Sequence, residues 1–468
     1  MFDRRKFLLT GTLATAGVYF SKASSFLDLQ NDFISQRPPV ADRKFSSEAV
    51  EKLIIRVKKV LKDPELAWMF ENCFPNTLDT TIKHHSNNGR PDTFVITGDI
   101  NAMWLRDSTA QVWPYLPLIK EDKNLSLLIE GVINRQTKCV LIDPYANAFN
   151  FGPEGSEWQT DITAMKPELH ERKWEVDSLC YVIRLAHGYW KVSGNTAPFD
   201  EDWNKAMKLI VKTFKEQQRK KDNGPYSFKR KTDSPHDTAQ GNGSGNPVKP
   251  VGMICSVFRP SDDGSIFPFL IPSNLFAVKS LLELGEMMYV LNDRAFASEC
   301  ETLAAEVTAA VLKYGIVSHK EFGSVYAYEV DGYGSSLFMD DANVPSLLSL
   351  PYIAGIDPNT PVYKNTRRMV LSNANPYYAE GKYSGVGGPH TGKEMIWPLS
   401  YIMRAMTSKD SMEIKYCIKM LKETHAGTGF IHESFHRDNP KQFTRSWFAW
   451  ANTIFGEMIL KLQNQKMI

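Results

Sequence analysis

The distribution of apolar and polar residues predicts a chain built mainly from amphipathic α-helices. Through most of the chain, apolar residues recur every three to four positions, a spacing that places them on one face of a helix. Alternation typical of strands is confined to residues 94–97 and 323–329. Apolar helical faces run through residues 50–61, 66–74, 125–133, 179–190, 203–214, 275–282, 296–311, 414–421 and 447–462. We therefore expect about a dozen helices and little sheet, with Ser273 as the N-cap of the helix that carries Leu275.

Long connections rich in Gly, Pro, Asp, Asn and aromatic residues separate these helices. They cover residues 143–161, 219–250, 257–272, 328–345, 377–393 and 425–445. Long irregular segments in a compact domain are usually functional or disordered. The composition of residues 220–250 favours partial mobility, whereas the aromatic residues of the other loops favour order. Helix pairs with elaborate loops on one side predict an all-α toroid, an (α/α)6 barrel with long active-site loops. An α-solenoid is the main alternative, but no period of about 30 to 47 residues repeats.

The segment 428–450 combines a carboxylate with imidazoles, aromatic rings and an arginine. Glu433 follows His432 and lies between Phe430 and Phe435, and Arg445 comes shortly afterwards. Aromatic rings can stack on a sugar, and a carboxylate can activate a water. A lone Glu in such a loop is more often a surface or ion-paired residue. The catalytic interpretation of Glu433 therefore requires a second carboxylate.

Asp262 and Asp263 provide that second carboxylate. Adjacent acids beside Arg259 are also compatible with an ordinary turn. In the functional interpretation, Asp262 is kept protonated by neighbouring carboxylates and aromatic walls, so that it donates a proton to a leaving oxygen. Glu433 then remains ionised and activates a water. Two carboxylates with divided protonation are the minimum for glycoside hydrolysis.

Further polar and aromatic residues have the chemistry of a sugar-binding site. Pairs of donors and acceptors bind vicinal hydroxyls, and aromatic faces stack on pyranose rings. The candidates are Trp104, Arg106, Asp107, Tyr145, Arg259, Asp340, Asp341, Asn343, His390, Trp397, His432 and Arg445. Asp340, Asp341 and Asn343 are also suitable ligands for a structural Ca²⁺, although no EF-hand loop is present.

Composition narrows the class of protein. The 468 residues are 43% hydrophobic and 23% charged, as in a globular protein with one large or two medium domains. The six cysteines are widely spaced in apolar contexts, which predicts buried free thiols and argues against a zinc site. No GxSxG, P-loop, HExxH or dinucleotide fingerprint occurs in a suitable context. We therefore expect no metal or cofactor.

The first 23 residues have the features of an export signal. Arg4, Arg5 and Lys6 precede an apolar stretch that runs to Phe20. This pattern predicts export to a bacterial periplasm by the twin-arginine or the general secretory route. Residues 24–45 form a lead segment, and residues 46–468 form a single catalytic domain.

Net charge bears on the partners of the exported chain. Removal of residues 1–23 takes away four basic residues and one acidic residue, so the net charge falls from +2 to nearly neutral. Nucleic acids and anionic membranes both require a concentrated basic surface. We therefore expect no nucleic-acid partner, no membrane insertion and a monomeric protein.

Several long motifs resemble glycoside hydrolase family 125, the bacterial exo-α-1,6-mannosidases. The resemblance covers about Leu66 to Leu460. Its motifs are residues 97–108 (TGDINAMWLRDS), 143–149 (DPYANAF), 258–263 (FRPSDD), 338–345 (FMDDANVP) and 444–450 (TRSWFAW).

This resemblance implies an (α/α)6 toroid that removes terminal α-1,6-linked mannose with inversion and without a catalytic metal. By motif, the general acid falls on Asp262 and the general base on Glu433. The substrate is then an α-mannoside oligosaccharide, from fungal mannan or a trimmed N-glycan. Residues 241–250 and 264–269 differ from the expected family pattern, which leaves the aglycone open. The alternatives are an inverting α-glucosidase on the same fold and a non-catalytic periplasmic glycan-binding protein.

Overall fold

Fourteen α-helices dominate the computed structural model, which describes residues 33–468. The predicted export signal and the first part of the lead segment lie outside the described residues. Ser35–Ile468 form one compact unit. The helices are α1 (Glu48–Val60), α2 (Pro64–Cys73), α3 (Asn76–Thr80), α4 (Leu105–Val112), α5 (Lys123–Ile142), α6 (Val176–Ser193), α7 (Glu201–Gln217), α8 (Ile271–Val290), α9 (Arg294–Ala310), α10 (Leu350–Ile353), α11 (Pro361–Val370), α12 (Pro398–Met406), α13 (Ser411–Thr424) and α14 (Ala449–Asn464).

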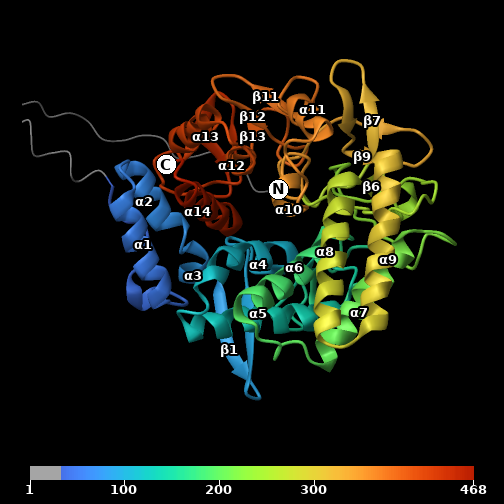
Figure 1. Cartoon of the computed structure of the whole chain (residues 1–468), viewed down its shortest axis with the longest axis horizontal. Coiled ribbons are helices and arrows are strands. Elements are labelled where there is room, and N and C mark those ends of the chain that lie inside the picture. Colours follow the sequence, from blue (N-terminus) through green and yellow to red (C-terminus); the bar gives the residue numbers. More distant parts are fainter. Residues whose placement is uncertain (1–32) are drawn as a thin grey trace, which may run out of the picture. The chain divides into compact units, whose positions relative to one another are not determined.

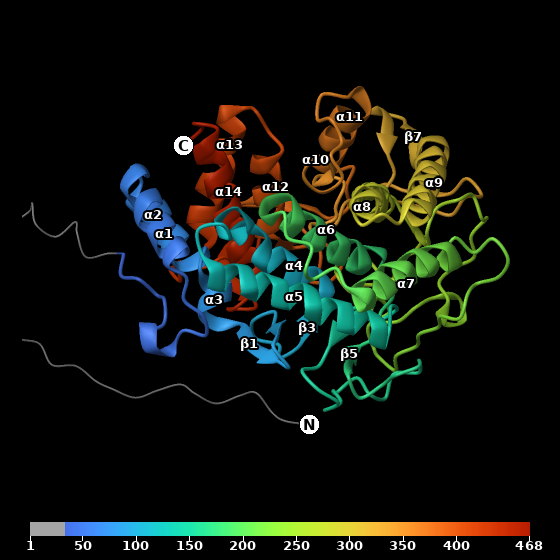
Figure 2. The ribbon, with the colours of Figure 1, turned by 60° about the horizontal axis from the view of Figure 1, so that its bottom comes forward.

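Every second helix from α4 onward belongs to an inner ring. Helix α4 packs on α6, α6 on α8, and α8 on α10; α12 packs on α14, which closes the ring against α4 (Figure 1). Outer helices pair with inner ones, as in α8 with α9 and α12 with α13. Figure 2 shows α5 and α7 beside α4 and α6. This alternation is the predicted (α/α)6 toroid.

The inner helices differ from the outer helices in burial. Outer helix α1 has Ser47 as its N-cap. It buries one apolar face, which includes Val50, Leu53 and Val57. All eight residues of inner helix α4 are buried, including Gln111. Because α4 is covered on every side, its buried polar groups must find hydrogen-bond partners within the protein. This is why the apolar periodicity fails at α4.

Short strands shape the loops. They are β1 (Ile82–Asn87), β2 (Arg90–Val95), β3 (Met103–Trp104), β4 (Ala148–Phe149), β5 (Leu169–Glu171), β6 (Phe269–Leu270), β7 (Ile316–His319), β8 (Gly323–Tyr326), β9 (Glu329–Val330), β10 (Ser336–Leu337), β11 (Tyr378–Glu380), β12 (Ser384–Val386), β13 (Met395–Ile396), β14 (Ser434–His436) and β15 (Asn439–Thr444). They form six antiparallel sheets of two or three strands, with orders such as β3-β4-β5 and β13-β14-β15. Most are too short to show an alternating pattern in the sequence.

One predicted helix start is wrong, and the cysteine prediction is confirmed. Helix α8 begins at Ile271 with Leu270 as its N-cap, so Ser273 lies inside the first turn. Pro272 is compatible with the first turn of a helix because no intrahelical partner is needed for its missing N–H.

All six cysteines are buried and free. Among the described residues, no helix is both long enough and apolar enough to cross a membrane.

Candidate active site

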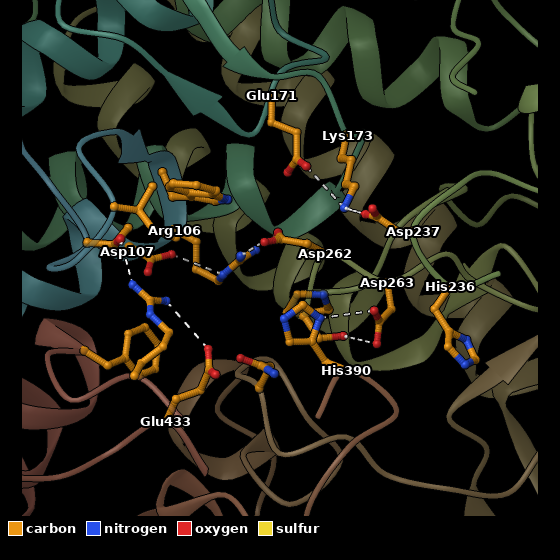
Figure 3. A pocket seen from close by; sticks show the side chains of 18 of the residues that line it. Arg106, Asp107, Glu171, Lys173, His236, Asp237, Asp262, Asp263, His390 and Glu433 are labelled. Carbon is orange, nitrogen blue, oxygen red and sulfur yellow. Dashed lines mark hydrogen bonds and ion pairs between the residues drawn. The ribbon is translucent and has the colours of Figure 1, made fainter. Parts of the chain in front are cut away.

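Three inner helices begin at a shared cavity of about 460 Å³. The N-cap residues Trp104 of α4, Trp397 of α12 and Phe448 of α14 line it directly. Two loop carboxylates, Asp262 and Glu433, point into it from opposite sides (Figure 3). A cavity of this size is suited to a small ligand such as a sugar. The ring therefore places residues from distant parts of the chain around one site.

A tight loop holds Asp262. Its N–H donates to the Arg259 carbonyl at 2.9 Å, and the Arg259 N–H donates to the Asp263 carbonyl at 2.8 Å. Asp262 has φ +66°, a left-handed conformation in which Asp is enriched among non-glycine residues. Its Oδ1 accepts hydrogen bonds from Arg106 and from the Asn147 amide, both at 3.2 Å. The carboxylate is therefore fixed by the loop and by two donors behind it.

Arg106 lies at the centre of a buried group of carboxylates. Its guanidinium donates to Glu175 at 2.6 Å and to Asp177 at 3.2 Å, and its Nε lies 3.5 Å from Asp107. With Asp262, four carboxylates surround one cation. Burial raises the pKa of Asp107 and of Asp177 to about 6, although Arg106 opposes this shift in both. These two acids therefore take up protons at a higher pH than an ordinary aspartate does.

The proton distribution differs from the sequence prediction for Asp262. Burial would raise the pKa of Asp262, but Arg106 and a hydrogen bond from Glu175 hold it well below its usual value. Burial raises the pKa of Glu175 well above its usual value; Arg106 opposes the shift, and the charges of Asp262 and Asp177 add to it. The pKa of Asp262 is therefore shifted in the direction opposite to the sequence expectation, and the raised pKa belongs to Glu175.

The opposite wall holds Glu433 at the start of a strand pair. Glu433 directly precedes β14, which pairs with β15. Arg445, just after β15, places its guanidinium 3.6 Å from the Glu433 carboxylate. Arg445 also donates to Asp99 at 2.8 Å and to Thr97 at 3.0 Å, and its guanidinium lies 4.5 Å from the Phe448 ring centre. A well-anchored guanidinium therefore faces the Glu433 carboxylate.

His390 provides a second cation beside the two carboxylates. Its Nδ1 lies 3.2 Å from Asp263. Burial would lower the pKa of His390, but the hydrogen bond and charge of Asp263, helped by Glu433 and Asp262, raise it to about 9. His390 is therefore an imidazolium at neutral pH. A positively charged ring that reaches into the cavity can donate hydrogen bonds to a hydroxylated ligand.

A third wall was not predicted from the sequence. It is formed by charged and aromatic residues of two loops: Glu157, Trp158, His170, Glu171, Lys173, Arg230, Ser234, His236 and Asp237. Arg230 donates to Asp161 at 2.8 Å and to Asp237 at 2.9 Å and lies 3.7 Å from the Trp158 ring centre. The segment 220–250, expected to be partly mobile, is therefore joined to the cavity wall by ion pairs. Isolated charges in polar loops gave no signal in the sequence.

The structure brings most of the predicted site residues together. Those that line the cavity are Trp104, Arg106, Asp107, Asp262, Asn343, His390, Trp397, Glu433 and Arg445. They come from six separate segments of the chain. Their catalytic or binding roles remain predictions.

Tyr145, Arg259 and His432 lie outside the cavity lining, which corrects their predicted place in the site. The Tyr145 hydroxyl donates to Glu216 at 2.9 Å. Arg259 forms a buried ion pair with Glu329 at 2.6 Å. The His432 ring stacks on Phe443 with 3.7 Å between ring centres. Each side chain already has a partner in the protein interior.

Asp340 and Asp341 are also buried behind the cavity, so their assignment is corrected as well. Asp340 accepts the backbone N–H groups of Leu347 and Leu348 at 2.8 and 3.0 Å. Asp341 accepts the Ser261 hydroxyl at 2.9 Å. These carboxylates hold the loops that carry Asn343 and Asp262. Among the described residues, no group of three or more His, Cys, Asp or Glu side chains is arranged to hold a metal ion.

The residues that sequence reasoning missed include Asn147 and Glu175, which contact Asp262 directly. Asn147 lies inside a motif quoted for the family resemblance, so that motif was the available signal. Glu175 is an isolated acid before a helix and carries no local signal.

Comparison with known proteins agrees with this geometry. A curated relative from Schizosaccharomyces pombe, the meiotically up-regulated gene 157 protein, is 44% identical over 451 residues, covering 92% of this chain and 89% of its own. A solved Streptococcus pneumoniae structure, described as a metal-independent alpha mannosidase in a non-productive complex with alpha-1,6-mannobiose, superimposes with a TM-score of 0.87 at 41% identity. That match covers 90% of this chain and 99% of the other.

More distant structures share the fold alone. A bacterial glucoamylase superimposes with a TM-score of 0.50 at 11% identity, over 86% of this chain and 56% of its own.

The sequence model of one family, described as metal-independent alpha-mannosidases (GH125), matches residues 63–460. This match covers nearly the whole ring and every wall of the cavity. The chain is therefore a member of the metal-independent α-mannosidase family GH125, and it is a glycoside hydrolase.

Proposed function

We propose that this enzyme removes a terminal α-1,6-linked mannose with inversion, using Asp262 as general acid and Glu433 as general base. The observation that carries the proposal is the pair of carboxylates that enter one cavity from opposite walls (Figure 3). Each has its own arginine: Arg106 lies 3.2 Å from Asp262, and Arg445 lies 3.6 Å from Glu433. The Streptococcus pneumoniae relative that was crystallised with alpha-1,6-mannobiose supports the choice of substrate.

The proposed reaction is a single displacement. Glu433 accepts a proton from a water as the water oxygen bonds to the anomeric carbon. The bond from that carbon to the glycosidic oxygen breaks, and Asp262 delivers a proton to the departing oxygen. Because attack and departure occur on opposite faces of the sugar, the α-linkage yields β-mannose.

Unused donors around the cavity suit the terminal mannose. The indole N–H groups of Trp104 and Trp450 are buried and have no hydrogen-bond partner among the described residues. Both side chains line the cavity, as does Arg106, whose Nε also makes no hydrogen bond within the described chain. Buried donors without partners are costly unless a ligand or water satisfies them. Sugar hydroxyls are suitable acceptors for them.

The charged third wall is the proposed site of the leaving sugar. Lys173 bridges Glu171 at 3.2 Å and Asp237 at 2.7 Å, so the wall presents paired charges (Figure 3). Such a surface favours a hydroxylated aglycone over an apolar one. We place the natural substrate among mannose-containing glycans, namely mannans or trimmed N-glycans. Hydrolysis of one by the purified enzyme, and not the other, would identify it.

Proton NMR tests the reaction directly. The enzyme is incubated with α-1,6-mannobiose, and the anomeric signals are followed before mutarotation equilibrates them. We expect β-mannose first. Early α-mannose would contradict inversion, whereas release of glucose from an α-glucoside panel, without release of mannose, would contradict the sugar assignment. Saturable binding without any product would support the glycan-binding alternative.

We also propose that the enzyme is exported as a monomer. The support is the basic start at Arg4 and Arg5 and the apolar stretch that follows. Mass spectrometry of the mature chain should show cleavage after about residue 23. Arg4→Lys with Arg5→Lys should block export if the twin-arginine route is used and leave it unchanged if the general secretory route is used. Sedimentation of the purified protein measures its oligomeric state.

A further inference from the structure

Glu175 and Asp262 are held side by side by two shared donors. Arg106 donates through one terminal nitrogen to Glu175 at 2.6 Å and through the other to Asp262 at 3.2 Å. The Asn147 amide nitrogen donates to both carboxyls, at 3.4 Å and 3.2 Å. Because Arg106 and Asn147 each contact both groups, the two carboxyls lie next to each other. The pair is therefore a fixed unit rather than two independent acids.

Only one member of this unit is accessible to a substrate. The Asp262 side chain is 23% exposed and lines the cavity, whereas the Glu175 side chain is 0% exposed and lies behind it. The Oε2 of Glu175 accepts from Arg106 and from the Ser178 hydroxyl, at 2.9 Å for the latter. Its Oε1 is left for Asn147 and Asp262. Glu175 can therefore exchange a proton with Asp262 but cannot touch the glycosidic oxygen.

The surrounding charges decide which carboxyl holds the proton. The ionisable groups that act on Asp262 besides Glu175 include Arg106, Asp107, His170, Lys173, Asp177 and His390. Those that act on Glu175 besides Asp262 are Arg106, Asp177 and Tyr226. Lys173 and His390 thus favour a negative charge on Asp262, while Asp177 disfavours one on Glu175. Two adjacent buried carboxyls cannot both ionise readily, so the pair retains one proton.

We infer that Glu175 is a positioning residue that stores the catalytic proton and transfers it to Asp262 during glycosidic cleavage. This inference rests on the proposed acid role of Asp262. As the C–O bond breaks, negative charge builds on the departing oxygen. The proton stored on Glu175 moves to Asp262, and Asp262 passes it to that oxygen. Glu175 is left as a carboxylate beside Arg106, and a solvent proton restores the pair after product release.

Glu175→Gln tests this transfer because the amide keeps the shape of the side chain but cannot release a proton. Kinetics are measured on α-1,6-mannobiose, whose leaving group needs a proton, and on 2,4-dinitrophenyl α-mannoside, whose leaving group does not. We expect kcat on the disaccharide to fall by about tenfold or more, and kcat on the aryl substrate to change by less than about threefold. The alkaline limb of the kcat/KM profile for the disaccharide should move to lower pH, because Asp262 then lacks its proton donor.

Two further variants separate proton storage from packing. Asp177→Asn removes another carboxylate from Arg106 but has no hydrogen bond with Asp262, so its loss should be similar for both substrates. Glu175→Asp keeps a titrating group and should retain more disaccharide activity than Glu175→Gln. The inference would be overturned if Glu175→Gln lowered kcat equally on the two substrates and left the alkaline limb of the kcat/KM profile unmoved. Glu175 would then only support the fold.

Asp262→Asn, measured in parallel, separates this inference from the proposed function. If Asp262→Asn shows the leaving-group dependence and Glu175→Gln does not, only the storage role fails. If Asp262→Asn itself shows no such dependence, the acid assignment fails and the inference fails with it. Thermal unfolding of each variant verifies that it is folded. If Glu175→Gln does not fold, the comparison of Glu175→Asp with Asp177→Asn on the two substrates provides the same test.

Discussion

The two walls of the cavity that carry Asp262 and Glu433 differ in how many acids share one arginine. On the wall of Asp262, four carboxylates share the single guanidinium of Arg106, and burial raises the pKa values of Asp107, Glu175 and Asp177. On the wall of Glu433, the guanidinium of Arg445 lies beside Glu433 and Asp99, and the charge of His390 also acts on Glu433. The first wall therefore holds acids with raised pKa values, and the second wall places two cations beside Glu433. The two walls are thus suited to an acid and a base, respectively.

The wall of Glu433 makes the strongest prediction. Glu433→Gln removes the group that accepts a proton from water, which every substrate needs. We expect kcat to fall by about 10³-fold or more on both α-1,6-mannobiose and 2,4-dinitrophenyl α-mannoside. Steady-state kinetics with both substrates measure it. Substantial activity in this variant would reject Glu433 as the base.

The acid wall should depend on the leaving group instead. Asp262→Asn is expected to lower kcat on α-1,6-mannobiose by about 10²- to 10⁴-fold, because the departing sugar oxygen needs a proton. On the dinitrophenyl substrate the loss should be far smaller. The ratio of the two losses is the measurement. If this ratio is close to the ratio measured for Glu433→Gln, the two walls do not differ in their dependence on the leaving group.

Replacement of Arg445 tests whether its guanidinium keeps Glu433 in place. Arg445→Gln removes the charge beside Glu433 and the ion pair with Asp99, so we expect about a tenfold to hundredfold loss in kcat/KM. Arg445→Lys, which keeps the charge but loses the forked geometry, should lie between this variant and the wild type. Equal activity of the glutamine variant and the wild type would show that the base needs no cation.

His390 gives a pH-dependent prediction of smaller size. Its folded pKa of about 9 lies above the ordinary imidazole value of about 6.5. Its charged pair with Asp263 therefore stabilises the folded protein fully below about pH 6.5, and this contribution is lost as the pH rises through about 9. Thermal unfolding should show His390→Gln less stable than wild type at pH 6, with the difference shrinking above pH 9. A difference independent of pH would contradict the imidazolium.

Tyr145 should affect stability but not catalysis. Tyr145→Phe removes the hydroxyl that donates to Glu216 outside the cavity. We expect wild-type kcat/KM and a loss of about 0.5–1.5 kcal/mol in the free energy of unfolding. Urea denaturation and kinetics on α-1,6-mannobiose measure the two effects. A clear rise in KM would return Tyr145 to the binding site.

Most of the ring was predictable because an outer helix has one buried face and therefore a regular apolar period. No apolar period was identified in the sequence over α4, α10, α11 or α12. Helix α10 has only four residues, and most residues of the inner helix α12 are buried. Short strands such as β3 and β13 were missed because two residues cannot alternate visibly.

The sequence by itself determined the helical class, the two carboxylates and the family motifs, because periodicity and motif spacing are local properties. The tertiary structure alone decided which acids share Arg106. It grouped Asp107, Glu175, Asp177 and Asp262 around one cation, although up to 155 positions separate them in the chain. The protonation of each acid depends on burial and on neighbouring charge. No local pattern encodes either quantity, which is why the raised pKa was expected at Asp262 and is found at Glu175.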